Sequence, residues 1–208
     1  MSINNLIKSF VTDLKPVKVF KYGAKDYCLI LLIGLFSILI SLAIAGIRND
    51  INDIIFTKRF IFEILILISL AMISSISALQ MSIPNIKTHY FKKIIFINLV
   101  VWLISIIYFF INSEFVLAGW GFNCAQEIIL TSVIPSFSIY FILKKASTLN
   151  RSVVGWLILT AGASYGALAA YFSCASNNPL HILIWHSLPV LIAGFIGFIA
   201  GNFILKKV

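Results

Sequence analysis

The chain has 208 residues, of which 61% are hydrophobic and 11% charged, and its mean hydropathy is +1.04. A soluble domain is about half apolar and about a quarter charged, so this composition excludes a soluble globular protein. At roughly 20 apolar residues per crossing, the chain holds about six membrane spans and has no room for a soluble domain of ordinary size. Any function must therefore reside in the bundle, its short loops or its N-terminal tail.

The N-terminal tail, residues 1–25, carries apolar side chains at helical spacing. They recur at i, i+3, i+4, i+7, i+8 and i+11, and they are Ile3, Leu6, Ile7, Phe10, Val11 and Leu14. This spacing predicts an amphipathic helix of about four turns. Asp13 and Pro16 mark its end, and residues 17–26 form a linker. Two interpretations remain open: the helix lies in the membrane interface, as its lysines favour, or it binds a groove on a cytosolic partner.

Six apolar segments long enough to cross a bilayer follow the tail: residues 27–47, 60–83, 94–111, 127–143, 153–172 and 181–205. We expect helices, because no segment alternates with period two and an unpaired backbone group in hydrocarbon costs several kcal/mol. The predicted fold class is all-α, a six-helix transmembrane bundle over residues 26–208. Residues 1–47 also show the outline of a signal peptide. Their apolar run of about 20 residues exceeds the usual 7–15, which favours retention as the first span.

Positively charged residues predict the orientation of the bundle. Of the 16 Lys and Arg residues, 13 lie in the tail, in the connections near residues 87–93 and 144–151, and at the C-terminus. The other three are Arg48, Lys58 and Arg59, close to Asp50 and Asp53. The positive-inside rule therefore places both termini in the cytoplasm. This topology and anionic lipid account for the net charge of +9, so no nucleic-acid partner is expected.

The three cysteines fall at two levels of the predicted bundle. Cys28 lies at the cytoplasmic start of the first span and is expected to be a small structural residue. Cys124 precedes the fourth span and Cys174 follows the fifth, so both lie at the outer end, where a bacterial inner-membrane protein can form disulfides. Coincidence would explain the shared depth, but a pair that forms a disulfide or binds a soft metal is the sharper hypothesis. No resident cofactor is expected, and metal binding would be transient.

Four ionisable residues share this outer level: Glu63, Glu127, His181 and His186. Ionisable groups within spans are costly and usually face other helices or a cavity. For Glu127 the plainer interpretation is favoured, in which a carboxylate at a helix start complements the helix dipole and reaches water. His186, with Glu63 as a further candidate, would complete a site with the two outer cysteines.

Small residues and prolines in the last spans predict how these helices pack. Gly162, Gly166 and Ala170 in the fifth span, and Gly197 with Gly201 in the sixth, allow close approach of these helices to each other or to neighbours. We expect Pro84 to end the second span and Pro189 to kink the sixth just after His186.

Motifs that would indicate an enzyme are missing from the sequence. It contains no HExxH, CxxC, GxSxG or phosphate-loop motif, so no enzymatic activity is expected. A small transporter that uses the outer Cys, His and Glu cluster is one alternative, but it would need polar residues at the midplane, where Asn98 is a rare example. A membrane oxidoreductase is another, but it would normally pair its thiols in a CxxC motif.

Short motifs run in a fixed order along nearly the whole chain. They are Asp13-Leu14-Lys15-Pro16-Val17, Arg59-Phe60 with Glu63, Ser82-Ile83-Pro84, Cys124, Pro135, Lys144-Lys145, Cys174 with Asn177-Asn178-Pro179, Trp185-His186 with Pro189-Val190, and Gly201. In this order and spacing the sequence resembles the NrsF-type membrane anti-sigma factors, which restrain an extracytoplasmic-function sigma factor at the inner membrane. The chain departs from the family pattern in using lysines where arginines are common and in having Asn85 where Gly is expected. These departures leave the identity of the sigma factor open.

The resemblance implies a six-helix bundle, a cytoplasmic tail that holds the sigma factor, and two outward cysteines tied to sensing. The expected function is that of a multi-pass anti-sigma factor in the bacterial inner membrane. It would release its sigma factor on a thiol, metal or oxidative signal from the envelope. The residues expected to bind the sigma factor are Leu6, Phe10, Asp13, Leu14, Pro16 and Val17. Cys124 and Cys174 are the expected sensing pair, with His186 as a further candidate metal ligand.

The charge distribution predicts a topology that reporter fusions can test. Reporters fused after residue 145 and after residue 208 should be cytoplasmic, and a reporter inserted near Asn177 should be external, because lysines and arginines in short flanking loops orient spans. Reporter activity in intact cells distinguishes the two sides of the membrane. An external C-terminus would contradict the six-span topology.

Overall fold

The computed structural model of the chain describes residues 22–83, 88–111, 119–144, 146, 148 and 150–205. The predicted tail helix and its partner-binding residues, from Leu6 to Val17, lie outside these ranges. In the described part of the chain the elements are helical, with no β-strand, which confirms the all-α fold class. The helices are α2 (Ala24–Ala45), α3 (Ile51–Ile54), α4 (Lys58–Met81), α5 (Thr88–Ile111), α6 (Phe122–Leu143), α7 (Arg151–Ser173), α8 (Pro179–Ile182), the π-helical turn η1 (Leu183–Ser187) and α9 (Leu188–Ile204).

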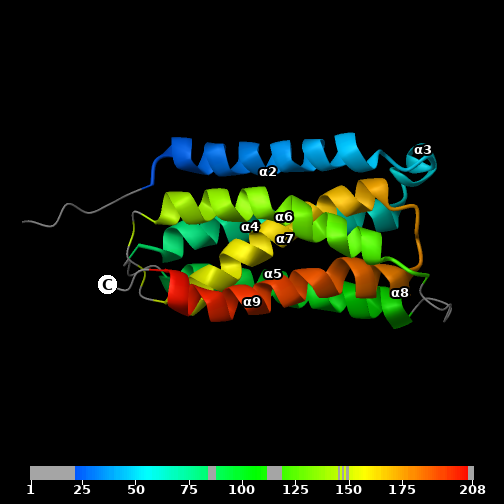
Figure 1. Ribbon diagram of the computed structural model, residues 1–208. Coiled ribbons are helices and arrows are strands. Elements are labelled where there is room, and N and C mark those ends of the chain that lie inside the picture. The colour runs from blue at the N-terminus through cyan, green and yellow to red at the C-terminus, as the bar shows by residue number, and fades with distance from the viewer. Residues whose placement is uncertain are drawn as a thin grey trace, which may run out of the picture.

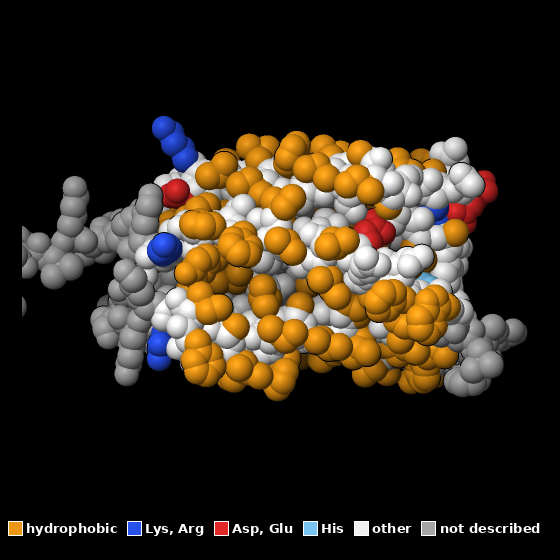
Figure 2. Space-filling view, viewed as in Figure 1, with side chains coloured by type: hydrophobic (Ala, Val, Ile, Leu, Met, Phe, Trp, Pro, Cys, Tyr) orange, Lys and Arg blue, Asp and Glu red, His pale blue; other side chains and the backbone are white. Residues whose placement is uncertain are grey.

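The long helices run side by side in one bundle, with α2 along one edge and α9 along the other (Figure 1). Among the described residues six helical segments are long and apolar enough to cross a membrane, and α8, η1 and α9 together form the last of them. Figure 2 shows apolar side chains over the middle of one face, while most charged side chains lie toward the two ends. The six predicted spans are thus confirmed as helices of spanning length.

The two ends of the bundle carry different elements. We call the end at which α2 begins and α9 ends the Tyr22 end, and the opposite end, which carries α3 and α8, the α3 end (Figure 1). The first described residues and the end of α9 therefore lie together. This arrangement follows from an even number of crossings.

Several helix boundaries differ from those predicted. The fourth predicted span starts at residue 127 but α6 starts at Phe122, and the third starts at 94 but α5 starts at Thr88. Hydropathy misses these first turns because they carry polar residues that end up outside the apolar stretch. The predicted linker over residues 17–26 is wrong at its end, because α2 already begins at Ala24. The Gly23 backbone N–H donates to Asp26 Oδ2 at 2.8 Å, which closes the first turn of α2.

Helix α7 forms the centre of the bundle and is the most buried of the spanning segments described. It packs on α9, α6, α4 and α2. Its buried positions include many Gly, Ala and Ser residues, whose small side chains let neighbouring backbones come close. The core on either side of it contains Leu70, Ile128 and Tyr165 toward one end and Leu79 and Leu157 toward the other.

Glycines mark the points where backbones touch. A Cβ at Gly197 would collide with the carbonyl oxygen of Gly155, and one at Gly201 would collide with that of Arg151, so α9 lies directly on α7. Gly162 and Gly166 instead face α6, where a Cβ would meet Ser136 and the backbone of Ile128. The predicted close packing of the last two spans is confirmed. The contact uses Gly155 rather than the glycines predicted on the fifth span.

The backbone contact between α7 and α9 can be tested by its effect on the stability of the bundle. Gly197→Ala should destabilise the bundle by about 1–3 kcal/mol, because the added methyl group forces two backbones apart. The loss should outweigh the better helix propensity of alanine. Thermal unfolding of the purified protein in detergent measures the effect, with Ile199→Ala, at an exposed position of the same helix, as the control. Equal stability of Gly197→Ala and the wild type would contradict the backbone contact.

Candidate functional site

Four sulfur and nitrogen donors converge at the α3 end of the bundle. They belong to Cys124, Cys174, His181 and His186, and one ligand atom from each lies within 4.8 Å of the others. Both histidines are buried, the cysteines are partly buried, and neither cysteine forms a disulfide. The structure therefore brings together the two predicted outer cysteines and both predicted histidines.

Local structure explains how three separate segments supply these donors. Cys124 lies in the first turn of α6, not before the span as predicted, and Cys174 follows the last residue of α7. A short loop then reverses the chain into α8. There the Asn178 side chain caps the helix by accepting a hydrogen bond from the Leu180 N–H at 2.9 Å, and Pro179 occupies a first-turn position. This tight reversal returns His181 to the sulfur of Cys174.

The π-helical turn η1 places His186 on the same side of its helix as His181. In an α-helix, residues five apart point roughly 140° away from each other around the axis. A π turn closes its hydrogen bond between residues five apart, so it widens the helix locally and brings such residues toward one face. The two imidazole rings are consequently 5.7 Å apart between centroids. Pro189 lies in the first turn of α9, directly after this π turn, and the kink expected there stays a prediction.

His181 is oriented by a hydrogen bond that leaves its other nitrogen facing the sulfurs. Its Nδ1 lies 3.2 Å from the carbonyl oxygen of Gly119, and its Nε2 lies 3.4 Å from Cys174 Sγ and 3.7 Å from Cys124 Sγ. A backbone carbonyl can only accept, so Nδ1 is the donor of this bond and Nε2 is the nitrogen that faces the sulfurs. An imidazole held in this way by its Nδ1–H is oriented to bind a metal through Nε2.

His186 has a buried ring with no hydrogen bond to any described group. Its side chain is 2% exposed, and both ring nitrogens lack a hydrogen-bond partner in the described part of the chain. The Tyr171 ring packs edge-on against it at a centroid distance of 5.1 Å and holds it in place. A buried polar group without a partner is costly, so this imidazole is suited to accept a ligand.

The two thiols influence each other. A hydrogen bond from the Cys124 thiol lowers the pKa of Cys174, because it stabilises the Cys174 thiolate more than burial opposes it. The thiolate is the form that binds metals and reacts with oxidants. Cys174 is thus the sulfur of the pair better prepared to ionise.

Two arginines hold the loop that carries Cys174. Arg48 is buried, donates to both Asp50 carboxylate oxygens at 2.7 Å, and also donates to Ala175 O and Asn177 Oδ1 at 3.0 Å. Arg59 donates to Asn177 O at 3.1 Å. The hydrogen bond from Arg48 also lowers the pKa of Asp50, which keeps this ion pair charged.

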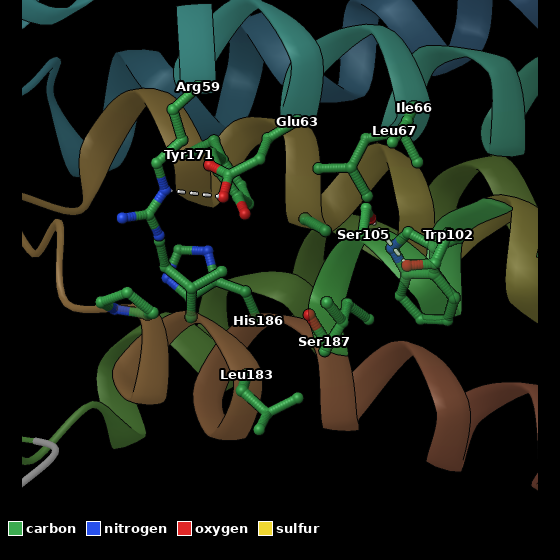
Figure 3. A pocket seen from close by; sticks show the side chains of 14 residues that line it. Arg59, Glu63, Ile66, Leu67, Trp102, Ser105, Tyr171, Leu183, His186 and Ser187 are labelled. Carbon is green, nitrogen blue, oxygen red and sulfur yellow. Dashed lines mark hydrogen bonds and ion pairs between the residues drawn. The ribbon is translucent and has the colours of Figure 1, made fainter. Parts of the chain in front are cut away.

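Glu63 lies beside the donor cluster but is not one of the four ligand-bearing residues. Its Oε1 accepts a hydrogen bond from Arg59 Nε at 3.0 Å (Figure 3). Arg59, Glu63, Tyr171 and His186 gather on one side of a cavity of about 30 Å³, and Trp102 and Ser105 line its other side. In this structure Arg59 is the partner of Glu63 Oε1, and the role of Glu63 in completing the site stays a prediction.

A second cavity leads from the α3 end to the donor cluster. Its volume is about 250 Å³, and its wall includes Arg48, Thr57 and Asn177 as well as Cys174 and His186. Its wall is more polar than those of the apolar grooves elsewhere on the bundle. Cys174 and His186 border this cavity, and the ring nitrogens of His186 remain buried.

Glu127 is partly exposed, and its carboxylate accepts hydrogen bonds from Ser41 Oγ at 2.7 Å and from Ser173 Oγ at 2.6 Å. It therefore connects α6 to both α2 and α7. That Glu127 complements the helix dipole and reaches water stays a prediction. Sequence reasoning missed both serines, and it also missed the loop-holding role of Arg48 and Asn177. The only sequence signal for the two serine contacts is a serine within an apolar span, and that signal does not identify the group to which the serine donates.

Comparison with known proteins gives a family but no close relative. No curated protein and no solved structure matches the chain. The model of one family matches residues 10–206, which is nearly the full length and includes all four donor residues. The chain therefore belongs to the NrsF family, described as negative regulators of sigma F.

Proposed function

We propose that this protein is a membrane-bound anti-sigma factor that holds an extracytoplasmic-function sigma factor through its N-terminal tail and releases it when the Cys124–Cys174 site receives a signal. The family is a negative regulator of a sigma factor, which gives the role. The observation that carries the rest is the convergence of four metal- and redox-capable donors at the end of the bundle opposite the root of the tail. That arrangement is suited to a receptor with its input on one side of a membrane and its output on the other.

The proposed location is the inner membrane of a bacterium, with the Tyr22 end in the cytoplasm. The positive residues of the tail, the two inner connections and the C-terminus support this orientation. The donor cluster would then face the envelope compartment, where thiols meet oxidants and metal ions.

The donor set favours a soft or borderline cation with tetrahedral geometry. Tetrahedral Zn²⁺ bound to two sulfurs and two nitrogens separates neighbouring ligand atoms by roughly 3.3–3.8 Å, given its usual bond lengths. The two sulfur-to-His181 distances, 3.4 and 3.7 Å, fall in that range. Thiolate and imidazole ligands select such ions over Mg²⁺ or Ca²⁺. Oxidation is the other signal to which the cysteine pair can respond: the two thiols lose two electrons and two protons to an oxidant and form a disulfide.

The predicted amphipathic helix of the tail can be tested by its effect on binding of the sigma factor. Phe10→Ala should weaken binding of the sigma factor by on the order of 2 kcal/mol, because a buried aromatic anchor of an amphipathic helix is lost. Pull-down of the sigma factor with the detergent-solubilised protein measures the loss. Thr12→Ala, on the polar face of the same predicted helix, is the matched control. Unchanged binding by both Phe10→Ala and Leu14→Ala would show that the tail is only an interfacial helix.

The proposed sensing role of the cysteine pair can be tested by substituting each cysteine. Cys124→Ser and Cys174→Ser should each fix the regulator in one state, because a signal acts only if it binds two conformations differently. Release of the sigma factor from the protein in nanodiscs is measured with Zn²⁺ in one arm and with diamide, a thiol oxidant that takes up two electrons and two protons, in the other. Visible absorption of added Co²⁺ reports thiolate ligation directly.

Cys28→Ser is the matched control for these variants, because Cys28 is exposed on α2 and lies outside the cluster. It should release the sigma factor as the wild type does. If both cluster variants respond normally to Zn²⁺ and diamide, and basal repression is also normal, the sensing role is refuted.

A further inference from the structure

The carboxylate of Glu127 lies where three helices meet beside the donor cluster. It is on α6, one turn after Cys124, and its two oxygens accept hydrogen bonds from serines on two other helices. Ser173 is the last residue of α7 and directly precedes Cys174. Ser41 belongs to α2 and is buried. One carboxylate therefore joins both cysteine-bearing segments to the helix that follows the tail.

At this end the chain just beyond α2 is bonded to α7 and its loop, because the Arg48 backbone N–H donates to Phe172 O at 2.9 Å and the Arg48 side chain donates to Ala175 O and Asn177 Oδ1. None of these contacts reaches α6, the helix of Cys124. Helix α2 runs along the edge of the bundle and packs mainly on α6 and α7 (Figure 1). Its other buried serine, Ser37, donates to Gly34 O within the same helix at 2.7 Å and makes no contact of this kind with a neighbour. A hydrogen bond to a charged group is stronger than one between neutral groups. The Ser41–Glu127 bond is thus a specific attachment of α2 to the helix of Cys124.

The other end of α2 leads to the tail and has its own attachments. Gln80 Nε2 donates to the Tyr27 hydroxyl, and the Tyr22 hydroxyl lies 2.8 Å from Ser82 Oγ just before the helix begins. Ser41 lies fourteen positions after Tyr27, which corresponds to about 21 Å of uninterrupted helix. A helix of this length moves as a rigid element, so a displacement at Ser41 is carried to Tyr27.

We propose that Glu127 is the positioning residue that couples the state of the Cys124–Cys174 site to α2 and so to the tail. When the two sulfurs are drawn together by a metal ion or a disulfide, the start of α6 and the end of α7 move relative to each other. Glu127 and Ser173 move with them, and the Ser41 hydrogen bond transmits the movement to α2. The proposal rests on the proposed function for its input and output, but it assigns the connection to residues outside the donor set.

The coupling can be tested without altering any donor. Ser41→Ala removes the hydrogen bond from α2 to Glu127, and Ser37→Ala removes another buried serine one turn away on the same helix. Ser173→Ala, with Ser164→Ala as its control, does the same on α7, because Ser164 donates only to Thr160 O within its own helix. Each variant is placed in nanodiscs with the bound sigma factor and treated with Zn²⁺ or diamide. Co²⁺ absorption is recorded in parallel.

The expected result separates coupling from assembly of the site. Ser41→Ala should bind Co²⁺ with the wild-type spectrum and hold the sigma factor, but its signal-dependent release should fall by about fivefold or more. Ser37→Ala and Ser164→Ala should release the sigma factor as the wild type does. Wild-type release by Ser41→Ala would overturn the proposal, since the hydrogen bond would then play no part in coupling. Loss of the Co²⁺ spectrum in Ser41→Ala would also overturn it, since the bond would then serve only to assemble the site.

Failure of the proposed function gives a different pattern. If neither Zn²⁺ nor diamide releases the sigma factor from the wild type, or if the Cys124→Ser and Cys174→Ser variants release it normally, the signal input is refuted and the coupling falls with it. If the cysteine variants lose release and Ser41→Ala keeps it, the input stands and only the role of Glu127 is refuted.

Discussion

Backbone contact between α7 and its neighbours sets the positions of most other elements in the bundle. Gly155 lies against Gly197 and Gly201 of α9, and Gly162 and Gly166 lie against α6. In lipid there is no hydrophobic force between helices comparable to that in water, so close van der Waals packing at small residues has to hold them together. Because α7 is fixed on two sides, its last residues, Ser173 and Cys174, are delivered to a defined place next to the start of α6.

Burial of polar groups imposes a second condition at the same end. Arginine, glutamate and histidine side chains within or next to spans are costly unless they meet partners. Arg48 meets Asp50 and the loop after α7, Arg59 meets Glu63 and the same loop, and Glu127 meets two serines. These pairings hold the loop and leave the cysteine and histidine donors facing one another. His186 is the group without such a partner among the described residues, which is why a ligand is the natural completion of the site.

The proposed signal and the proposed output lie at opposite ends of the bundle, and the connection between them has to be mechanical. A ligand shifts a conformational equilibrium only by its differential affinity for the two states. Drawing two sulfurs together changes the distance between the start of α6 and the end of α7, and Glu127 touches both segments and α2. A connection made of two serine hydrogen bonds and one continuous helix is short enough for each link to be removed singly.

Much of the architecture could be predicted from the sequence alone. Composition and apolar run length determined a six-helix membrane bundle, because hydrocarbon permits no other chain geometry for such segments. That Cys124, Cys174, His181 and His186 share one level of the bundle also followed from their positions along the spans. Sequence position gives depth in the membrane but not the rotation of each helix, so it could not decide which groups at that depth meet.

Tertiary structure decided which of these side chains come into contact. The π-helical turn η1 orients His186 toward His181. No local sequence pattern predicts this turn, because it depends on how α8 and α9 pack on the rest of the bundle. Glu63 is bonded to Arg59 and is not among the four converging donors, and Glu127 accepts hydrogen bonds from Ser41 and Ser173. Hydropathy ranks these residues by their cost in lipid, whereas their actual partners depend on three-dimensional packing. The sequence by itself therefore determined the fold class and the level of the site, and only helix packing determined which side chains form it.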